Sequence, residues 1–406
     1  MEQLHIDRLG HQGDGIAPGP VYVPATLPGE VVEGAVSDGV MHAPRIVTPS
    51  PNRIKPPCPH ARGCGGCQLQ HAREDFTESW KLDVVRRALD AQGLGAPIRG
   101  IVNSPAQSRR RASFSARRTK KGAQAGFHQK GSDTIVAIPN CLLLRPALVA
   151  ALPMVEALAL EGASRKGELS VLVTETLAGL DVAVTGGKPV DTALRAALAD
   201  LARAHDLARI TWDGDSLARR PAFQRFGKAE VVPPPGAFLQ ATAEGEAALL
   251  AGVLEALDGC KRTADLFAGC GTFALPLAQQ AEVLAVEGDK PMTAALDRGW
   301  REAQGLKKVT TQARDLFRNP LLPDELDRLD GLVIDPPRAG AETQVAQIAK
   351  AKVPLVAHVS CNPVTFARDT AALMGAGYEL DWVQVVDQFR WSTHVELVAK
   401  LRFKGA

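Results

Sequence analysis

The chain has 406 residues, of which 45% are hydrophobic and 23% are charged, and this length suffices for two or three domains with cores of their own. Its 47 lysines and arginines nearly balance 45 acidic residues, which excludes a global positive field that would hold polyanions. No signal peptide or uninterrupted apolar span is visible, because charged residues and prolines break the most apolar stretch at 142–160. We therefore expect a cytoplasmic protein that does not contact membranes.

Residues 1–48 alternate apolar and polar positions between glycine and proline turns, as in Glu-Val-Val-Glu-Gly-Ala-Val at 30–36. A period of two predicts strands, and short strands between frequent turns are typical of a small β-barrel of the TRAM or OB type. The prolines of Thr-Pro-Ser-Pro at 48–51 then indicate a linker. The sequence therefore predicts a first domain over residues 1–50.

Three of the seven cysteines lie within ten residues, at Cys58, Cys64 and Cys67, and Cys141 follows at a distance. In a reducing compartment this favours metal or catalytic thiols over disulfides. Four thiolates suit tetrahedral zinc or a four-iron cluster, and the spacing alone does not choose between them. We expect this centre in a central α+β domain over residues 51–235, in which an amphipathic helix is predicted at 76–91.

Seven basic residues lie within thirteen positions, from 109 to 121. Such density usually marks a solvated face, but this segment is also the best candidate in the chain for contact with the phosphates of a nucleic acid. The candidate contact residues are Arg109, Arg110, Arg111, Phe114, Arg117 and Arg118.

Beyond Pro-Pro-Pro-Gly at 233–236, short β-branched runs alternate with helical segments. This alternation is the signature of an open parallel sheet with helices between its strands. We therefore predict a Rossmann-like α/β domain over residues 236–406. Its strands are predicted at 263–267, 283–287, 308–312, 331–334 and 355–360.

A glycine-containing turn, Ala-Gly-Cys-Gly-Thr at 268–272, follows an apolar strand and precedes a helix predicted at 274–280. Glycines let the backbone approach a ligand closely, although a lone Gly-x-Gly fits an ordinary turn equally well. Glu287, Asp315 and Asp335 each end or follow a predicted strand, at the edge where open α/β sheets bind ligands. Because the phosphate-gripping Gly-x-Gly-x-x-Gly is absent, an adenosine that carries a sulfonium fits better than a dinucleotide.

Cys361 follows the fifth predicted strand within Ser-Cys-Asn-Pro at 360–363, so its thiol should face the same crevice. A thiolate there is a strong nucleophile, although buried structural cysteines are common. Glu396 ends His-Val-Glu at 394–396 and is, by position alone, an edge-strand carboxylate.

The Gly-Cys-Gly turn, Asp-Pro-Pro-Arg at 335–338, Ser-Cys-Asn-Pro and His-Val-Glu together resemble, in order and spacing, the family of RNA 5-methyluridine methyltransferases. The resemblance implies a class I methyltransferase with Cys361 as nucleophile and Glu396 as base. It also implies that the cofactor S-adenosylmethionine is surrounded by Gln240, Phe267, Thr272, Glu287, Asp315 and Asp335.

This resemblance extends over nearly the whole chain. The cysteine motif is similar to the family's iron–sulfur motif, which implies a 4Fe-4S cluster held by Cys58, Cys64, Cys67 and Cys141. Residues 4–36 resemble the family's RNA-binding TRAM barrel, although acidic residues outnumber arginines there. The family's usual Phe-x-Gln-x-Asn appears at 238–242 with Thr242 in the last position.

The implied chemistry needs both a thiol and a carboxylate. Carbon 5 of uracil is too weak a nucleophile to attack a methyl sulfonium unaided, and thiolate addition at carbon 6 makes it an enolate. A carboxylate must then remove the proton from carbon 5 before the thiol can leave. The family implies a structured RNA as partner, with 23S ribosomal RNA favoured over transfer RNA, and we expect a monomer.

Two other functions remain open. Methyltransferases for exocyclic amino groups also use Asp-Pro-Pro, but an aromatic residue generally follows the prolines, where this chain has Arg338. They would not need Cys361. A catalytically inactive RNA-binding or assembly factor could keep the fold, but retention of Cys361, Glu396 and the cofactor turn argues against it.

Overall fold

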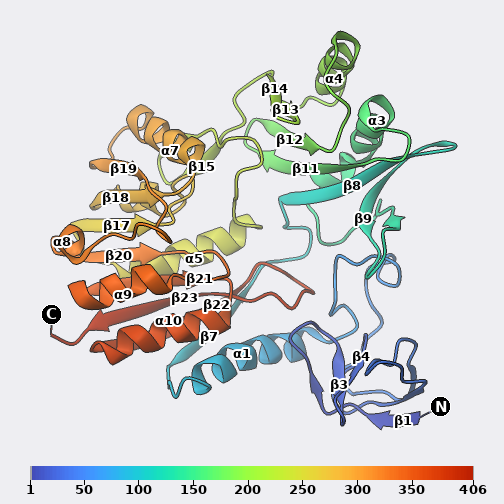
Figure 1. Ribbon diagram of the computed structural model, residues 1–406, viewed down its shortest axis with the longest axis horizontal. Coiled ribbons are helices and arrows are strands. Elements are labelled where there is room, and N and C mark those ends of the chain that lie inside the picture. Colours follow the sequence, from blue (N-terminus) through green and yellow to red (C-terminus); the bar gives the residue numbers. More distant parts are fainter. Residues whose placement is uncertain (1, 406) are drawn as a thin grey trace.

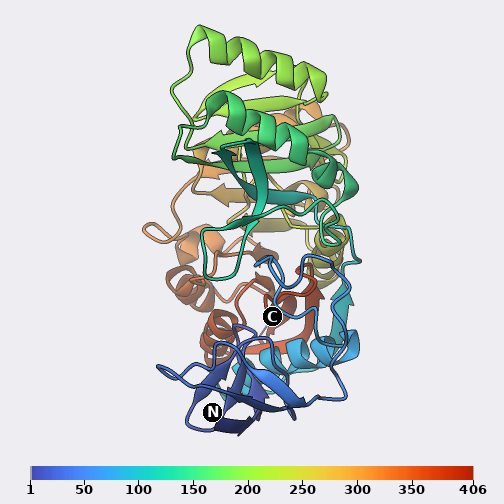
Figure 2. The same ribbon diagram turned by 90° about the vertical axis from the view of Figure 1, so that its right-hand side faces the viewer.

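The computed structural model describes residues 2–405, and its strands fall into N-terminal, central and C-terminal groups (Figure 1). The C-terminal sheet lies on the left of Figure 1, with the central sheet at the upper right and the N-terminal strands at the lower right. Figure 2 shows the central sheet and the N-terminal strands at opposite ends of the molecule. Within the described residues, no helix is both long and apolar enough to cross a membrane.

The N-terminal strands form two three-stranded antiparallel sheets, β1-β5-β6 and β2-β3-β4. Strands thus occur where the alternating pattern predicts them, and they surround one small core. That core consists of Ile6, Ala17, Val23, Val32 and Met41. The strand bounds are β1 Glu2–His5, β2 Arg8–Leu9, β3 Gly15–Ala17, β4 Val21–Val23, β5 Val31–Gly34 and β6 Arg45–Thr48.

The central sheet has seven strands within residues 2–405, in the order β10-β9-β8-β11-β12-β13-β14. One face is apolar and packs against α3 and α4, because alternate residues such as Phe114, Val171 and Val182 point to that side. The other face is polar. The bounds are β8 Arg111–Thr119, β9 Gly122–His128, β10 Ile135–Val136, β11 Glu168–Thr176, β12 Gly179–Thr185, β13 Arg209–Trp212, β14 Asp215–Ala218, α2 Pro146–Ala150, α3 Leu152–Gly162 and α4 Thr192–Ala204, followed by the hairpin β15 Gln224–Phe226 and β16 Ala229–Val231.

The C-terminal sheet has eight strands in the described chain, in the order β19-β18-β17-β20-β21-β23-β22-β7 (Figure 1). Its first five strands are parallel and begin and end within one residue of the predicted strands. Helices α5, α6 and α7 cover one face, and α1, α8, α9 and α10 cover the other. The bounds are β7 Ile98–Asn103, β17 Arg262–Leu266, β18 Glu282–Glu287, β19 Val309–Ala313, β20 Gly331–Ile334, β21 Leu355–Ser360, β22 Tyr378–Asp387, β23 Glu396–Phe403, α1 Glu74–Asp90, α5 Ala243–Ala256, α6 Ala274–Leu277, α7 Lys290–Glu302, α8 Pro323–Leu326, α9 Glu342–Ala351 and α10 Pro363–Gly375.

Residues 74–103 pack with this C-terminal sheet, although the sequence places them in the stretch expected to form the central domain. The strand β7 pairs in parallel with β22, and α1 buries Val85 and Leu89 in the same core as α10. The apolar stripe of α1 predicts an amphipathic helix, but it does not say which core buries the stripe. The C-terminal sheet is therefore completed by a segment from the first quarter of the chain.

The strand order reverses beside β17. From β17 the chain moves outward through β18 to β19, and it then crosses back to add β20 and β21 on the other side. Such a reversal opens a crevice at the carboxyl ends of parallel strands, where ligands bind in open α/β sheets. The loops that follow β17, β18, β20 and β21 converge on this crevice.

Candidate active site

A pocket of about 500 Å³ opens at the carboxyl ends of the parallel strands. Small-molecule sites usually have volumes of about 300–1,000 Å³. Thr272 is the one predicted cofactor residue that does not line the pocket. The predicted residues that do line it are Gln240, Phe267, Glu287, Asp315, Asp335, Cys361 and Glu396.

The turn after β17 has an unusual backbone. Phe267 has a φ of 65° and Gly269 a φ of 56°, and this left-handed region strains a residue that carries a Cβ. The N–H of Gly269 donates to Glu287 Oε2 at 2.9 Å, and the N–H of Asp289 donates to Oε1 at 2.8 Å. Glu287 therefore holds this turn in place while it lines the pocket.

Two aromatic rings form one wall of the pocket. The ring centroids of Phe267 and Phe317 lie 5.4 Å apart, and the N–H of Phe317 donates to the carboxylate of Asp315 at 3.0 Å. Flat apolar surfaces beside carboxylate acceptors suit a nucleoside, because the base stacks while the ribose hydroxyls donate hydrogen bonds. No sequence motif pointed to Phe317, which lies in the loop after β19.

The pocket carries an excess of negative charge. The carboxyl groups of Glu287, Asp315, Asp335 and Glu396 face it, whereas Arg338 is its one guanidinium among the described lining residues. Burial raises the pKa of Asp335 to about 7, so ionising this carboxyl is costly. A cation bound there would favour the ionised form. The residues therefore fit a ligand with a positive centre, such as a sulfonium.

Cys361 lies between β21 and the N-terminus of α10, where Asn362 caps the helix by accepting the N–H of Val364 at 3.1 Å. The positive end of a helix favours a thiolate. Burial opposes it, and so do the nearby carboxylates of Glu396 and Asp335; together they raise the pKa of Cys361 to about 11. The thiol is therefore protonated at neutral pH until its surroundings change.

Glu396 begins β23 and is held by Gln388, which no sequence motif had singled out. The side-chain amide of Gln388 donates to Glu396 and also to Gln240 Oε1 at 2.6 Å. Gln388 Oε1 in turn accepts the N–H of Thr242 at 3.3 Å. Burial raises the pKa of Glu396 to about 8, and the charge of Asp335 contributes, while the hydrogen bond from Gln388 opposes the rise. Gln388 thus links the candidate base to a candidate cofactor residue.

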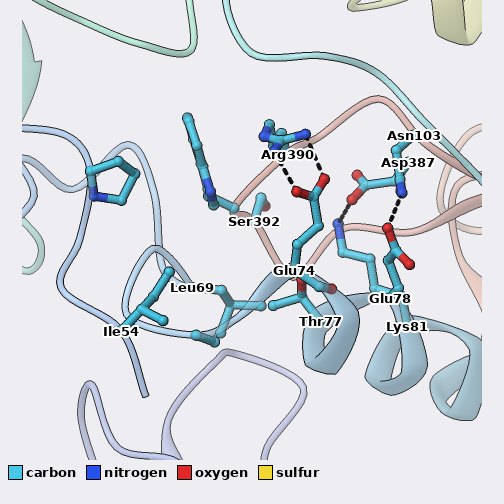
Figure 3. Close-up of a pocket in the computed structure, with 13 residues that line it drawn as sticks. Ile54, Leu69, Glu74, Thr77, Glu78, Lys81, Asn103, Asp387, Arg390 and Ser392 are labelled. Atoms are coloured by element: carbon cyan, nitrogen blue, oxygen red, sulfur yellow. Dashed lines mark hydrogen bonds and ion pairs between the residues drawn. The ribbon is translucent and has the colours of Figure 1, made fainter. Parts of the chain in front are cut away.

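The end of β22 and the loop that follows it are fixed to α1 by charged pairs (Figure 3). Lys81 Nζ lies 2.6 Å from the carboxylate of Asp387, and the guanidinium of Arg390 lies 2.8–2.9 Å from that of Glu74. Lys81 is only 1% exposed, so its pair is shielded from water. These residues line a cavity of about 250 Å³ between α1 and the loop. The helix therefore positions the segment that leads to the candidate base.

The four cysteines of the predicted metal centre line one small cavity of about 20 Å³, formed around Cys58, Cys64, Cys67 and Cys141. Burial and the charges of the other three thiols raise the pKa of Cys67 to about 12. Among residues 2–405, however, no group of three or more His, Cys, Asp or Glu side chains has the arrangement of a metal site. The donor chemistry fits a metal centre, whereas the present side-chain arrangement does not form one.

Burial corrects two of the predicted RNA contacts. Phe114 is 1% exposed and stacks on Phe127 with ring centroids 5.5 Å apart, because its position on β8 points to the helix-covered face. Arg110 is 8% exposed, lies 2.6 Å from the carboxylate of Glu246 and donates to the carbonyl of Gln240 at 3.2 Å. Both residues are therefore structural, and Arg110 helps to position Gln240.

The remaining basic residues are more accessible. Arg109 and Arg111 are half-buried at the start of β8, whereas Arg118 is exposed near its end. Arg117 lies 2.7 Å from the carboxylate of Glu168, which offsets part of its charge. The predicted RNA surface is thus reduced to these four arginines.

Comparisons with known proteins cover nearly the full length of the chain. A model of the family described as tRNA (uracil-5-)-methyltransferase matches residues 231–402. An uncharacterized RNA methyltransferase of Rhizobium meliloti (strain 1021) is 44% identical over 407 residues, which are 98% of this chain and 98% of that protein. The 23S rRNA (uracil(1939)-C(5))-methyltransferase RlmD of Shewanella amazonensis is 31% identical over 421 residues, covering 98% of this chain and 94% of that protein.

A solved structure shares the fold. The crystal structure of Pyrococcus abyssi tRNA (uracil-54, C5)-methyltransferase in complex with S-adenosyl-L-homocysteine matches with a TM-score of 0.78 and 23% identity, covering 98% of this chain and 99% of that chain. The similarity shows an α/β methyltransferase fold. The full-length relatives, the family model and this shared fold show that the chain belongs to the family of S-adenosylmethionine-dependent RNA uracil-5-methyltransferases.

Proposed function

We propose that the chain methylates carbon 5 of one uridine in 23S ribosomal RNA through a covalent bond between Cys361 and the uracil ring. The observation that carries the mechanism is that one thiol and one separate buried carboxylate, Glu396, line the same pocket. That pocket also has the aromatic wall that suits a nucleoside. The reaction needs these two groups in different steps.

In the first step Cys361 attacks carbon 6 of the uracil as a thiolate. A bond forms between Sγ and carbon 6, and the π electrons of the ring double bond move toward the carbonyl oxygen at carbon 4. Bound S-adenosylmethionine supplies an electrophilic methyl group and a positive charge beside the carboxylates. Carbon 5 of the enolate would form a bond to this methyl group while the methyl–sulfur bond breaks and the cofactor leaves as a neutral thioether, so that carbon 5 carries both a methyl group and a proton. Glu396 accepts that proton, the double bond re-forms, and the bond from carbon 6 to Sγ breaks to release the thiolate.

The pKa of Glu396 predicts how the final step depends on pH. Only the ionised carboxylate accepts a proton, so the decay of the covalent RNA adduct should accelerate as pH rises and level off above about pH 8. In Gln388→Leu this break should move to higher pH, because the lost hydrogen bond stabilises the ionised form. Measuring the single-turnover decay rate of the adduct across a pH series gives the pH at which this rate levels off. An unchanged break in Gln388→Leu would remove Gln388 from this role, and Gln388→Asn tests partial rescue.

The full-length relative from Shewanella amazonensis favours ribosomal RNA as the substrate, because that protein is named as a 23S rRNA methyltransferase and the alignment spans 98% of this chain. The alternative is transfer RNA, on which the structural relative from Pyrococcus abyssi acts. Total RNA from a strain that lacks this gene should acquire one 5-methyluridine when incubated with the purified protein and labelled methyl donor. Mass-spectrometric mapping to 23S rRNA supports the proposal, and mapping to tRNA selects the alternative. No labelled uridine in either RNA would contradict both.

We further propose that Cys58, Cys64, Cys67 and Cys141 hold a 4Fe-4S cluster in a central domain within 51–235, between an N-terminal barrel at 1–50 and the methyltransferase domain at 236–406. Residues 74–103 are excepted from the central domain, because they pack with the C-terminal sheet. Four thiols around one cavity support a metal, because their mutual repulsion as thiolates needs a cation to offset it. This proposal requires the cavity to expand when the metal binds.

The metal content tests the cluster directly. Protein purified without oxygen should be brown and contain about four iron atoms per chain. Cys64→Ser should lose iron and solubility, since metal binding contributes folding energy. Cys260→Ser is the matched control, because this buried cysteine lies in a different core and should leave the iron content unchanged. Stoichiometric zinc without iron would reject the cluster.

A further inference from the structure

The face of the central sheet opposite α3 and α4 carries small hydroxyl side chains, of which Ser113, Ser170 and Thr185 are exposed. The cross-strand register places Ser115, Ser170 and Thr185 in one row, from β8 through β11 to β12. The next row runs through Ser113, Leu172, Ala183, Thr211 and Ser216. In Figure 1, α3 and α4 lie above this sheet, so the hydroxyl-bearing side faces the rest of the molecule.

This face forms an open groove of about 610 Å³ between the sheet and the segment that leads into the C-terminal domain. Its polar lining includes Ser113, Ser170, Thr185 and Thr211, and Pro235 and Gly236 form the opposite wall. Arg111 is the single charged residue among the described residues that line it. The groove is therefore weakly positive, with many hydrogen-bonding groups and no carboxylate in its described lining.

Arg111 connects this groove to the active site. Its guanidinium donates to the carbonyl of Gly236 at 3.0 Å, and no carboxylate of residues 2–405 pairs with it. Two residues further along, Phe238 is 58% exposed and lines the pocket that contains Cys361. The groove and the active-site pocket are thus separated by only a few residues of one segment.

The far end of the same sheet is also basic. Arg118, Lys120 and Lys121 lie at the β8–β9 turn, and all three are exposed. Within the described chain none of them is in an ion pair, so their charges remain available to a polyanion. The hydroxyl rows lie between Arg111 at one end and the pair of Arg117 with Glu168 at the other, and the exposed lysines of the turn lie beyond that pair.

We propose that this face binds a single strand of the substrate RNA, contacting its phosphates and ribose 2′-hydroxyls and directing it toward the pocket of Cys361. The inference rests on the proposed function. Serine and threonine hydroxyls are common partners of phosphate and sugar oxygens, and they act as donors or acceptors toward a 2′-hydroxyl. A protein partner fits less well, because the cores of protein interfaces are rich in aromatic side chains, which this groove lacks in its described lining.

The first test places negative charge in the groove. The double variant Ser170→Glu/Thr185→Glu should bind a labelled oligouridylate of about twelve nucleotides roughly tenfold more weakly than the unaltered chain, because both new carboxylates repel the phosphates. The matched control is Thr192→Glu, which adds a carboxylate at an exposed position on the helix-covered side of the same sheet. It should bind as the unaltered chain does. Equal affinities for both variants would overturn the proposal.

The second test asks whether the face distinguishes ribose from deoxyribose. Ser113→Ala/Ser170→Ala/Thr185→Ala should reduce the preference for oligouridylate over the matching oligodeoxyuridylate, because the 2′-hydroxyl is the group that differs between them. Arg111→Gln should instead weaken both and lower the salt dependence by about 0.7 in the logarithmic slope, as expected for one phosphate contact on a single strand. An unchanged preference in the alanine variant would overturn the ribose contact.

These tests separate the proposal from the proposed function. If the unaltered chain forms 5-methyluridine in RNA but the groove variants bind RNA normally, the groove assignment fails while the activity stands. If the groove variants lose affinity but the unaltered chain methylates no uridine, the groove assignment stands and the activity fails. Unfolding midpoints close to that of the unaltered chain confirm that the substitutions act on the surface.

Discussion

Glu396→Gln is expected to accumulate a covalent RNA complex that already carries the transferred methyl group. The variant keeps the thiol of Cys361, so addition at carbon 6 and methyl transfer can proceed. It lacks the carboxylate that removes the proton from carbon 5, and the thiol therefore cannot leave. A denaturing gel with labelled methyl donor should show a slow-migrating, labelled band, and turnover should fall on the order of 10⁴-fold or more.

Cys361→Ala is the matched control, because it should bind RNA yet give neither the band nor methylated RNA. Peptide mapping of the trapped complex should locate the adduct at Cys361. The other cysteine near the cofactor turn, Cys270, is 2% exposed and does not line the pocket, so it should remain unmodified. Methylation by Cys361→Ala, or an adduct on Cys270, would refute the covalent mechanism.

Lys81→Met should lower the free energy of unfolding by about 3–5 kcal/mol, because it leaves a buried carboxylate without its partner. Lys81 is 1% exposed and Asp387 is 8% exposed, and their charged atoms lie 2.6 Å apart. Equilibrium unfolding in urea measures the change. The double variant Lys81→Met/Asp387→Leu should recover most of the loss, since it removes both charges.

Arg86→Met on the same helix controls for the loss of a cation. Its pair with Asp83 is exposed, so the free energy of unfolding should change by no more than about 1 kcal/mol. An equally small effect of Lys81→Met would mean that water reaches the buried pair, and that the pair does not fix the loop before Glu396.

The parallel strands and most pocket residues were predictable because their signals are local. Most of the parallel strands are short runs rich in apolar and β-branched residues between turns, and a carboxylate that ends or follows such a strand reaches the crevice through strand geometry alone. The positions of Glu287 and Asp335 at the pocket follow from this logic. The edge of the parallel sheet that carries the pocket could therefore be inferred from the sequence.

Features that depend on long-range packing were not predictable in this way. Arg110 and Phe114 belong to a basic run, yet strand alternation and a partner on α5 bury both of them. Gln388 bonds to Glu396 across a loop, and no spacing rule connects the two residues. The membership of β7 in the C-terminal sheet likewise depends on a pairing between residues almost three hundred positions apart.

The placement of β7 has a practical consequence for dissecting the protein. A fragment restricted to the stretch matched by the family model, residues 231–402, would lack β7 and expose the side of β22 that pairs with it. Because β22 spans ten residues, its unsatisfied backbone would form a long open edge of the kind that recruits other chains into aggregates. The catalytic half should therefore be isolated only together with residues 74–103.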